Sequence, residues 1–299
     1  MHYAKIPVCL IALLLALMLS ACGGQKTSSN DNASPTDEMQ VSDEAQVSDE
    51  KHSNKKDSGK EQGNAQAPQA TEAGNVANAI VRTPDERLAQ SNSVNDRPPE
   101  DKVVYLTFDD GPSSNTPNIL ATLDKYGVKA TWFVKGNSDS MQYLSDIWDS
   151  NNQIAIHTYT HDYEAIYASE SAYWGDVNQA ADAIEAEVGF RPTLVRFPGG
   201  SYNSYNTGLA DTLTTDMSLN GFHYFDWNVS SGDGGEHSAD EIYGYVTEGA
   251  NGCHSCCVLM HDSAAKNTTV EALPRIIEYF IDNGYTFDVL VSDSFGYHF

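Results

Sequence analysis

The stretch Val103-Val104-Tyr105-Leu106-Thr107-Phe108-Asp109-Asp110-Gly111-Pro112 (residues 103–112) decides the fold of this chain. Its first six residues are mostly β-branched or aromatic, which predicts a buried strand over Val103–Phe108. Asp-Gly-Pro is typical of turns, so the strand ends where two carboxylates, Asp109 and Asp110, begin. A Thr-Pro pair at 116–117 then predicts the start of a helix. A strand, an acidic turn and a helix in succession form the first unit of an alternating α/β fold.

The same alternation continues to the end of the chain. Apolar residues at helical spacing predict helices at 116–126, 177–188 and 273–281, and the residues that end them are Gly127, Gly189 and Asn283-Gly284. Short apolar runs predict strands at 128–134, 193–197, 222–229, 257–260 and 285–291. Strands that alternate with helices predict a mostly parallel sheet, either open or closed into a barrel.

Reactive side chains follow the predicted strands. They lie at or near five strand ends and are Asp109, Asp110, His157, Arg196, Asp226 and His261. In α/β barrels the side chains at the carboxyl ends of the strands converge on one mouth, so this set predicts an active site built in one place.

His157 and His161 are four residues apart, so on a helical turn both imidazoles would point the same way. With one carboxylate they give three zinc ligands and an open fourth position, which is typical of a catalytic metal site. The spacing alone is weak evidence, but its conjunction with the Asp109-Asp110 pair is strong. Zn²⁺ is the metal predicted, with Co²⁺ and Ni²⁺ as alternatives.

The remaining groups predict hydrolysis. A metal lowers the pKa of water, and a carboxylate that does not bind the metal can take the proton. A histidine elsewhere, His261, can give a proton to a poor leaving group such as an amine. Metal, base and acid together indicate cleavage of an amide or an ester.

Five segments, taken in order, resemble the five motifs of the polysaccharide deacetylases, the NodB-homology enzymes of carbohydrate esterase family 4. They are Thr107-Phe108-Asp109-Asp110-Gly111-Pro112, His157-Thr158-Tyr159-Thr160-His161, Arg196-Phe197-Pro198-Gly199-Gly200, Asp226-Trp227 and Leu259-Met260-His261. The resemblance covers residues 101–291. It implies a distorted (β/α) barrel of the NodB-homology type. It also implies removal of N-acetyl groups from peptidoglycan, chitin-like chains or poly-N-acetylglucosamine, or of O-acetyl groups from xylan.

The resemblance also implies a role for each matching residue. Asp109 would be the general base, and the metal ligands would be Asp110, His157 and His161. His261 would be the general acid, Asp226 would orient its imidazole and raise its pKa, and Arg196 would steer Asp109. The backbone N–H of Gly199 would bind the oxyanion, although the family often has Tyr at this position. Trp227 and Leu259 would line the slot for the acetyl methyl group.

The N-terminus carries an export signal. Residues 6–19 are almost wholly apolar, and Leu19-Ser20-Ala21-Cys22 resembles a bacterial lipobox. We therefore expect residues 1–21 to be a lipoprotein signal peptide and Cys22 to be lipidated, which would anchor the protein extracytoplasmically to the cell membrane. An ordinary secretory signal is the alternative.

Composition divides the rest of the chain. Of 30 aromatic residues only Tyr3 precedes position 100, so residues 22–99 predict a disordered polar stalk and 100–299 the catalytic domain. The net charge of −25 argues against nucleic acid as a partner. We expect a monomer. Within the domain, a disulfide from Cys253 to Cys256 or Cys257 is weakly favoured in an exported protein.

The leading hypothesis is a metal-dependent N-deacetylase of a cell-surface polysaccharide, with peptidoglycan as the first candidate. The alternatives are deacetylation of poly-N-acetylglucosamine, chitin oligomers or acetylxylan. A non-catalytic glycan-binding lipoprotein is the third hypothesis, and it predicts that the metal is dispensable.

Overall fold

A computed structural model of the chain describes residues 77–91 and 95–299. The expected signal peptide, Cys22 and the greater part of the expected stalk lie outside these residues. Within them, no helix is both long and apolar enough to cross a membrane.

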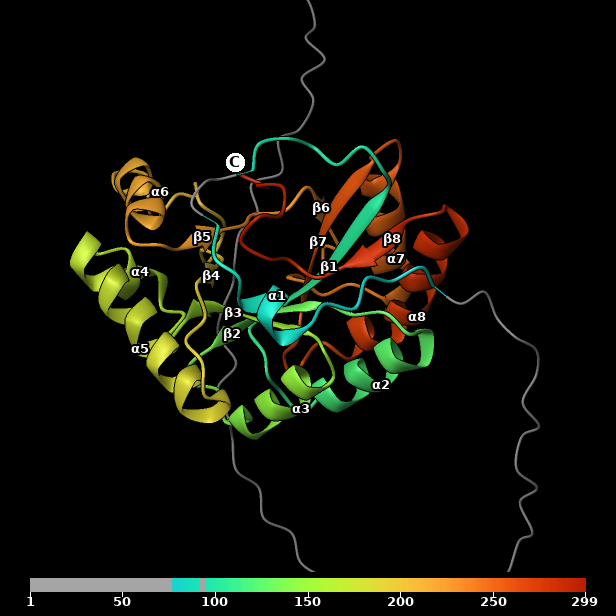
Figure 1. Cartoon of the computed structure of the whole chain (residues 1–299), viewed down its shortest axis with the longest axis horizontal. Coiled ribbons are helices and arrows are strands. Elements are labelled where there is room, and N and C mark those ends of the chain that lie inside the picture. The colour runs from blue at the N-terminus through green and yellow to red at the C-terminus, as the bar shows by residue number, and fades with distance from the viewer. Residues whose placement is uncertain (1–76, 92–94) are drawn as a thin grey trace, which may run out of the picture. The chain divides into compact units, whose positions relative to one another are not determined.

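The sheet is parallel throughout and curls, with helices along its outer side (Figure 1). Its strands are β1 (Val103–Asp109), β2 (Thr131–Lys135), β3 (Gln153–Thr158), β4 (Leu194–Val195), β5 (His223–Tyr224), β6 (Val229–Ser230), β7 (Ser255–His261) and β8 (Thr286–Asp288). Their order is β5-β4-β3-β2-β1-β7-β6, and β8 pairs with the first half of β1. This arrangement confirms the distorted (β/α) barrel, and the sheet is not closed between β5 and β6 along the described hydrogen-bonded path.

The helices follow the strands as expected of an α/β fold. They are α1 (Pro84–Leu88), α2 (Thr116–Tyr126), α3 (Leu144–Asp149), α4 (Tyr163–Ile166), α5 (Glu170–Val188), α6 (Ala210–Leu219), α7 (Ala239–Ala250) and α8 (Asn267–Asp282), with a short 3₁₀ turn at Met141–Tyr143. Both α2 and α5 end as predicted, at Gly127 and Gly189, whose φ angles of 69° and 80° lie in the left-handed region that favours glycine.

Two apolar clusters cover the two faces of the sheet. The larger one joins alternate strand residues such as Leu106, Trp132 and Ile156 to the helices. The smaller one lies on the other face and joins Tyr105 and Phe133 to Leu290 and other residues near the C-terminus. Because both faces are buried, β1 is covered along its whole length, and only its carboxyl end at Asp109 reaches the site.

The expected boundary of the domain at residue 100 is too late. Arg82 pairs with Asp288 at 2.6 Å, and Ala79 forms a bridge with Phe287 of β8. Arg87 is buried, with its guanidinium 3.4 Å from the ring centre of Trp148. Residues 77–91 therefore pack on the domain, although their aromatic-free sequence resembles a stalk, because they contribute cations to aromatic and acidic partners further along the chain.

Two other expectations need correction. Residues 222–229 do not form one strand, because β5 and β6 are separate and Asp226 lies between them. The favoured disulfide is also not formed: Cys253, Cys256 and Cys257 are free thiols. Alternation along β7 explains part of this, since Cys256 joins the larger cluster and Cys257 the smaller one on the opposite face.

Candidate active site

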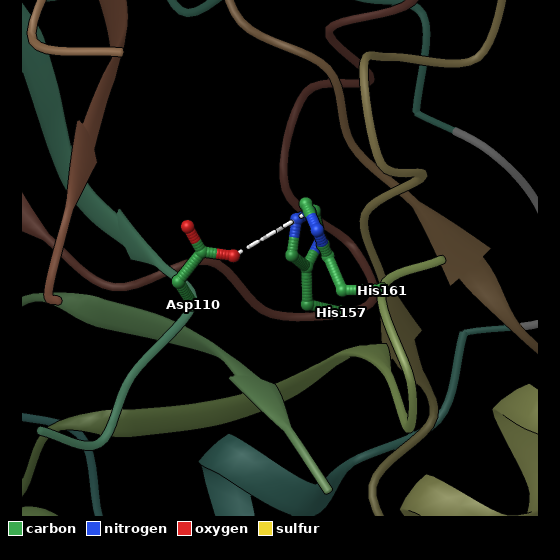
Figure 2. Close-up of side chains that lie close together, drawn as sticks. All are labelled: Asp110, His157 and His161. Carbon is green, nitrogen blue, oxygen red and sulfur yellow. Dashed lines mark ion pairs between the residues drawn. The ribbon is translucent and has the colours of Figure 1, made fainter. Parts of the chain in front are cut away.

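Asp110, His157 and His161 come together at the carboxyl end of the sheet. One ligand atom from each lies within 4.8 Å of the others. Oδ1 of Asp110 lies 3.9 Å from Nε2 of His157 and 3.4 Å from Nε2 of His161, and Figure 2 shows the carboxylate facing both rings. This Oδ1 atom is buried and accepts no hydrogen bond. A buried carboxylate oxygen that accepts no hydrogen bond and lies beside two imidazole nitrogens suits a divalent metal site, so the three residues fit a metal.

The two histidines meet through a turn and not through the expected helix. His157 lies in β3, whereas His161 follows the strand with a φ of 57°. The rings lie 5.0 Å apart between centres. Nδ1 of His157 lies 2.9 Å from the carbonyl oxygen of Arg196, which leaves Nε2 for the metal. Asp110 also has a positive φ of 71°, so two of the three ligands have a backbone conformation uncommon outside glycine.

Asp176 of α5 holds the turn that carries His161. Its carboxylate accepts hydrogen bonds from the backbone N–H groups of Tyr159 and Thr160 and from the Thr160 hydroxyl. Asp176 is 9% exposed. Sequence reasoning missed this residue because it lies mid-helix, 15 positions after His161, and only its position on the buried side of α5 distinguishes it.

Asp109 and Arg196 form a buried ion pair next to the candidate metal site. Nη1 of Arg196 donates to Oδ1 of Asp109 at 2.8 Å, and the guanidinium is fully buried. Arg196 also donates to the Thr107 hydroxyl and to the carbonyl oxygens of Phe225 and Asp226. Oδ2 of Asp109 lies 3.8 Å from Nε2 of His157. The arginine therefore fixes one carboxylate oxygen of Asp109 and leaves the other beside the candidate metal ligands; its steering role in catalysis stays a prediction.

Asp262 secures the turn that carries the two acidic residues. Its backbone N–H donates to the carbonyl oxygen of Asp109 at 2.8 Å. Its buried carboxylate accepts from Ser113, Thr116 and Trp132. A Cβ atom on Gly111 would lie 2.7 Å from Oδ2 of Asp262, so only glycine fits this turn.

Asp233, and not Asp226, orients His261. Nδ1 of His261 lies 2.7 Å from Oδ1 of Asp233, and the backbone N–H of His261 donates to Oδ2. Ser231 and Thr269 donate to the same carboxylate, which is 1% exposed. The physical reason is the sheet order: β6 pairs with β7, so the turn after β6 lies beside the end of β7, where His261 is. The Ser-Gly-Asp-Gly turn at 231–234 is the feature of the sequence that could have indicated Asp233.

Asp226 instead supports the loop of the third motif. Its buried carboxylate accepts from the backbone N–H and hydroxyl of Ser201 and from the backbone N–H of Phe299. The loop includes Gly199, whose φ is 75°. A Cβ atom there would lie 2.9 Å from Cε1 of Tyr163, so the Tyr163 ring fills the space beside this glycine.

Leu259 and Trp227, the two residues expected to line the acetyl slot, lie in different surroundings. Leu259 lies in β7, two residues before His261, and is 8% exposed. Trp227 is half-buried after β5, with its ring edge-on to Phe299 at 4.9 Å and 5.7 Å from the guanidinium carbon of Arg196. No hydrogen bond or ring contact between Trp227 and His261 is found among the described residues, so the slot-lining role stays a prediction.

The charges of the site suit metal binding and proton transfer. Burial is the main cause that lowers the pKa of His161 to about 4, and the neighbouring His157 adds to it. At pH 7 the imidazole of His161 is therefore neutral, which is the form that can bind a metal. Burial acts against ionisation of Asp110, yet the nearby histidines lower its pKa on balance. Burial also acts against charging His261, but the Asp233 carboxylate outweighs it and raises the pKa of His261 to about 9. His261 is thus poised as a proton donor.

Comparisons with known proteins agree with this geometry. Residues 96–217 match the family model described as polysaccharide deacetylase. The putative polysaccharide deacetylase YheN of Bacillus subtilis is 32% identical over 197 residues, which are 64% of this chain and 67% of that protein. The bifunctional xylanase/deacetylase of Pseudobutyrivibrio xylanivorans is 33% identical over 65% of this chain, but the match spans only 30% of that larger protein.

A solved structure shows the same fold. The catalytic domain of peptidoglycan N-acetylglucosamine deacetylase from Eubacterium rectale superposes with a TM-score of 0.65 and is 37% identical. The match covers 69% of this chain and 97% of that domain. With its fold and these relatives, the chain belongs to the polysaccharide deacetylases, the NodB-homology enzymes of carbohydrate esterase family 4, which hydrolyse N-acetyl amide bonds of peptidoglycan or other polysaccharides.

Proposed function

We propose that the protein removes N-acetyl groups from peptidoglycan, with a divalent metal held by Asp110, His157 and His161. The observation that supports the metal is the buried Oδ1 of Asp110, which accepts no hydrogen bond and faces both imidazoles. Zn²⁺ suits two imidazoles and one carboxylate, and Co²⁺ and Ni²⁺ bind similar sets. When bound, the metal supplies Lewis-acid activation of water and of the amide carbonyl.

The chain supplies the base and the oxyanion donor. Asp109 takes the proton of the attacking water, because Arg196 fixes Oδ1 and leaves Oδ2 beside the ligands. The backbone N–H of Gly199 then faces the oxygen that gains charge, a role that rests on the resemblance of the third motif. Leu259 and Trp227 are proposed to line the acetyl slot.

The chain also supplies the acid. Asp233 accepts from Nδ1 of His261, so Nε2 carries the proton that goes to the departing sugar amine. The amine is a poor leaving group without that proton, which is why an imidazolium held by a carboxylate is suited to amide cleavage. Asp226 contributes indirectly, through the loop that presents Gly199.

The setting of the enzyme is proposed from the sequence. Residues 1–21 would be a signal peptide and Cys22 a lipid anchor to the cell membrane, so the monomeric domain would work on wall polysaccharide outside the cytoplasm. Peptidoglycan deacetylases among the relatives support this substrate, whereas the xylanase/deacetylase supports acetylxylan as the alternative.

Acetate release separates these candidates. The full chain, loaded with Zn²⁺, is given purified peptidoglycan, chitin oligomers and acetylxylan at equal acetyl concentration. We expect the highest kcat/KM on peptidoglycan. Release from acetylxylan alone would replace the proposed substrate, and binding of peptidoglycan without acetate release would favour the non-catalytic glycan-binding hypothesis.

A further inference from the structure

The loop of the third motif is built on two consecutive glycines. Gly199 and Gly200 both have positive φ angles, of 75° and 87°. Glycine adopts this conformation without steric cost but is also the most permissive residue, so contacts from outside must fix the direction of the backbone N–H groups. On one side of the loop, Asn203 donates to the carbonyl oxygen of Gly200 at 3.0 Å. The other side is held by Asp226 through Ser201.

Residues 297–299 hold Asp226 in turn. The backbone N–H of Asp226 donates to the carbonyl oxygen of Tyr297 at 2.6 Å, and the backbone N–H of Phe299 donates to Oδ2 of Asp226 at 2.9 Å. The same buried carboxylate accepts from the backbone N–H of Ser201 at 2.7 Å and from its hydroxyl at 2.5 Å. One side chain thus joins residues 297–299 to the loop, and both of its oxygens accept hydrogen bonds.

The ring of Phe299 packs directly on the same loop. A Cβ atom on Gly200 would lie 2.6 Å from Cε2 of this ring, so the ring fills the space where any other residue would place its side chain. The ring also lies edge-on to Trp227, with the ring centres 4.9 Å apart. Phe299 therefore restrains the loop in two ways, through its N–H by way of Asp226 and through its ring at Gly200.

The segment itself is anchored on both sides of the gap between β5 and β6, and this end of the chain is marked C in Figure 1. Nε2 of His298 lies 3.0 Å from the carbonyl oxygen of Tyr224 in β5, and the two rings stack with their centres 4.1 Å apart. On the other side Tyr297 is buried, and its hydroxyl is hydrogen-bonded to that of Ser255 in β7, the partner strand of β6. Residues 297–299 are therefore fixed to the sheet, as a positioning element must be.

We propose that residues 297–299 position the third-motif loop for catalysis, with Phe299 as a positioning residue that acts through Asp226 and Gly200. The inference rests on the proposed function, in which the backbone N–H of Gly199 faces the oxygen that gains charge. Loss of one such donor costs roughly 10²–10³-fold in kcat, so its direction matters. In the described part of the chain, Phe299 forms no hydrogen bond or ring contact with the candidate metal ligands, so it acts on kcat and not on metal affinity.

Two substitutions at one position separate the N–H of Phe299 from its ring. Phe299→Pro removes both, whereas Phe299→Ala keeps the N–H and loses the ring. A hydrogen bond to a charged group is equivalent to roughly 10–100-fold in an equilibrium, so amide hydrogen exchange over residues 197–203 should accelerate about that much in Phe299→Pro and less in Phe299→Ala. We expect kcat on peptidoglycan to fall roughly tenfold or more in Phe299→Pro, with KM and Zn²⁺ affinity within a few-fold of wild type.

Phe295→Ala is the matched control for loss of a ring. Phe295 lies in the same stretch of chain, but its ring is edge-on to Tyr297 at 5.0 Å and has no ring contact with Trp227 among the described residues. This variant should keep the wild-type exchange over residues 197–203 and the wild-type kcat.

Asp226→Ala tests the route of the effect, because it removes the acceptor through which the Phe299 N–H acts. In that background Phe299→Pro and Phe299→Ala should lower kcat equally, since only the ring is left to lose. A larger loss from the proline in that background would exclude Asp226 as the intermediary and contradict the proposal.

Wild-type exchange over residues 197–203 together with wild-type kcat in Phe299→Pro would overturn the positioning role. So would parallel losses of kcat, Zn²⁺ affinity and melting temperature, because they indicate general destabilisation. The proposed function fails separately, if the Zn²⁺-loaded wild-type enzyme releases acetate from none of its candidate substrates. Amide exchange in the Phe299 variants needs no turnover and would still decide whether the segment positions the loop.

Discussion

Nδ1 of His261 lies 2.7 Å from Oδ1 of Asp233, and this carboxylate is 1% exposed. The pair joins the end of β7 to the turn after β6. Because the Asp233 oxygens also accept from Ser231, Thr269 and the backbone of His261, the imidazole has one orientation. Its pKa is raised to about 9, against the effect of burial, so the proposed acid is charged at the pH where it works.

This pair predicts the alkaline limb of the pH–rate profile. A proton donor with a pKa of about 9 is charged below that pH, so acetate release should fall as the pH rises through about 9. Asp233→Asn removes the charge that raises the pKa and leaves the burial that lowers it, so the limb should move to lower pH and kcat/KM at pH 8 should fall. The measurement is kcat/KM from pH 5 to 10.

Asp226→Asn is the matched control for that experiment. Asp226 is as buried as Asp233 but does not contact His261, and the limb should stay where it is in wild type. A limb that moved in Asp226→Asn and not in Asp233→Asn would return the orienting role to Asp226.

The same pair makes stability depend on pH. The pKa of His261 is higher in the folded chain than the ordinary value of 6.5, so the pair stabilises the fold fully below about pH 6.5. The contribution is lost as the pH rises through about 9. The free energy of unfolding should therefore fall more steeply between pH 7 and 9 for wild type than for Asp233→Asn. Parallel curves from urea titrations of the metal-free proteins would contradict this.

Asp109→Asn should separate catalysis from metal binding. The variant keeps the size of the side chain and leaves Asp110, His157 and His161 unchanged. We expect kcat to fall roughly 10²–10⁴-fold, because general base catalysis contributes about that much. Zn²⁺ affinity, measured by competition with a chromophoric chelator, should stay within a few-fold of wild type. Full activity would remove Asp109 from the role of base, and His161→Ala serves as the control that loses the metal.

Asp176 offers a test of how the fold builds the metal site. Asp176→Asn loses acceptors for the backbone N–H groups of the turn before His161, so that ring is less well placed. Groups that orient metal ligands are worth roughly 10–100-fold in metal affinity. We expect a loss of that size by chelator competition, with far-UV circular dichroism unchanged. Asp182→Asn, on the same helix but 73% exposed, should bind Zn²⁺ like wild type.

The N-terminal boundary can be tested by truncation. A chain that begins at residue 75 retains the Arg82–Asp288 pair and the buried Arg87, whereas one that begins at residue 100 loses both. The loss leaves Asp288 buried without its cation, and such changes cost roughly 3–5 kcal/mol. At roughly 2–4 °C per kcal/mol for a domain of this size, the melting temperature should fall by about 6 °C or more. Equal melting temperatures of the two truncated chains would indicate that residues 77–99 belong to the stalk and not to the domain.

Much of the site could be predicted from the sequence because its residues follow strands. Four site residues each end or follow an apolar run that the sequence shows plainly, and parallel strands bring the ends of these runs together. These residues are Asp109, Asp110, His157 and His261. Arg196 was placed correctly for the same reason. The helices α2 and α5 ended where glycine permits a positive φ.

What the sequence could not provide was the pairing order around the gap in the sheet. Residues 222–229 are apolar enough for one strand, but the chain leaves the sheet between β5 and β6. As a result, Asp226 forms a hydrogen bond with Ser201, and Asp233 forms one with His261. The spacing of His157 and His161 likewise predicts a helical turn where the chain forms a loop, because spacing alone does not distinguish the two. Asp176 holds the turn before His161 through tertiary contacts that no local pattern indicates.

Metal-dependent acetate release from purified peptidoglycan tests the central claim most directly. The full chain is treated with a chelator, dialysed, and assayed before and after addition of one equivalent of Zn²⁺, with His161→Ala in parallel. We expect release to be abolished by chelation, restored by Zn²⁺ in wild type, and absent in His161→Ala under both conditions. Undiminished release by the chelated wild-type protein, or full activity of His161→Ala, would contradict the account.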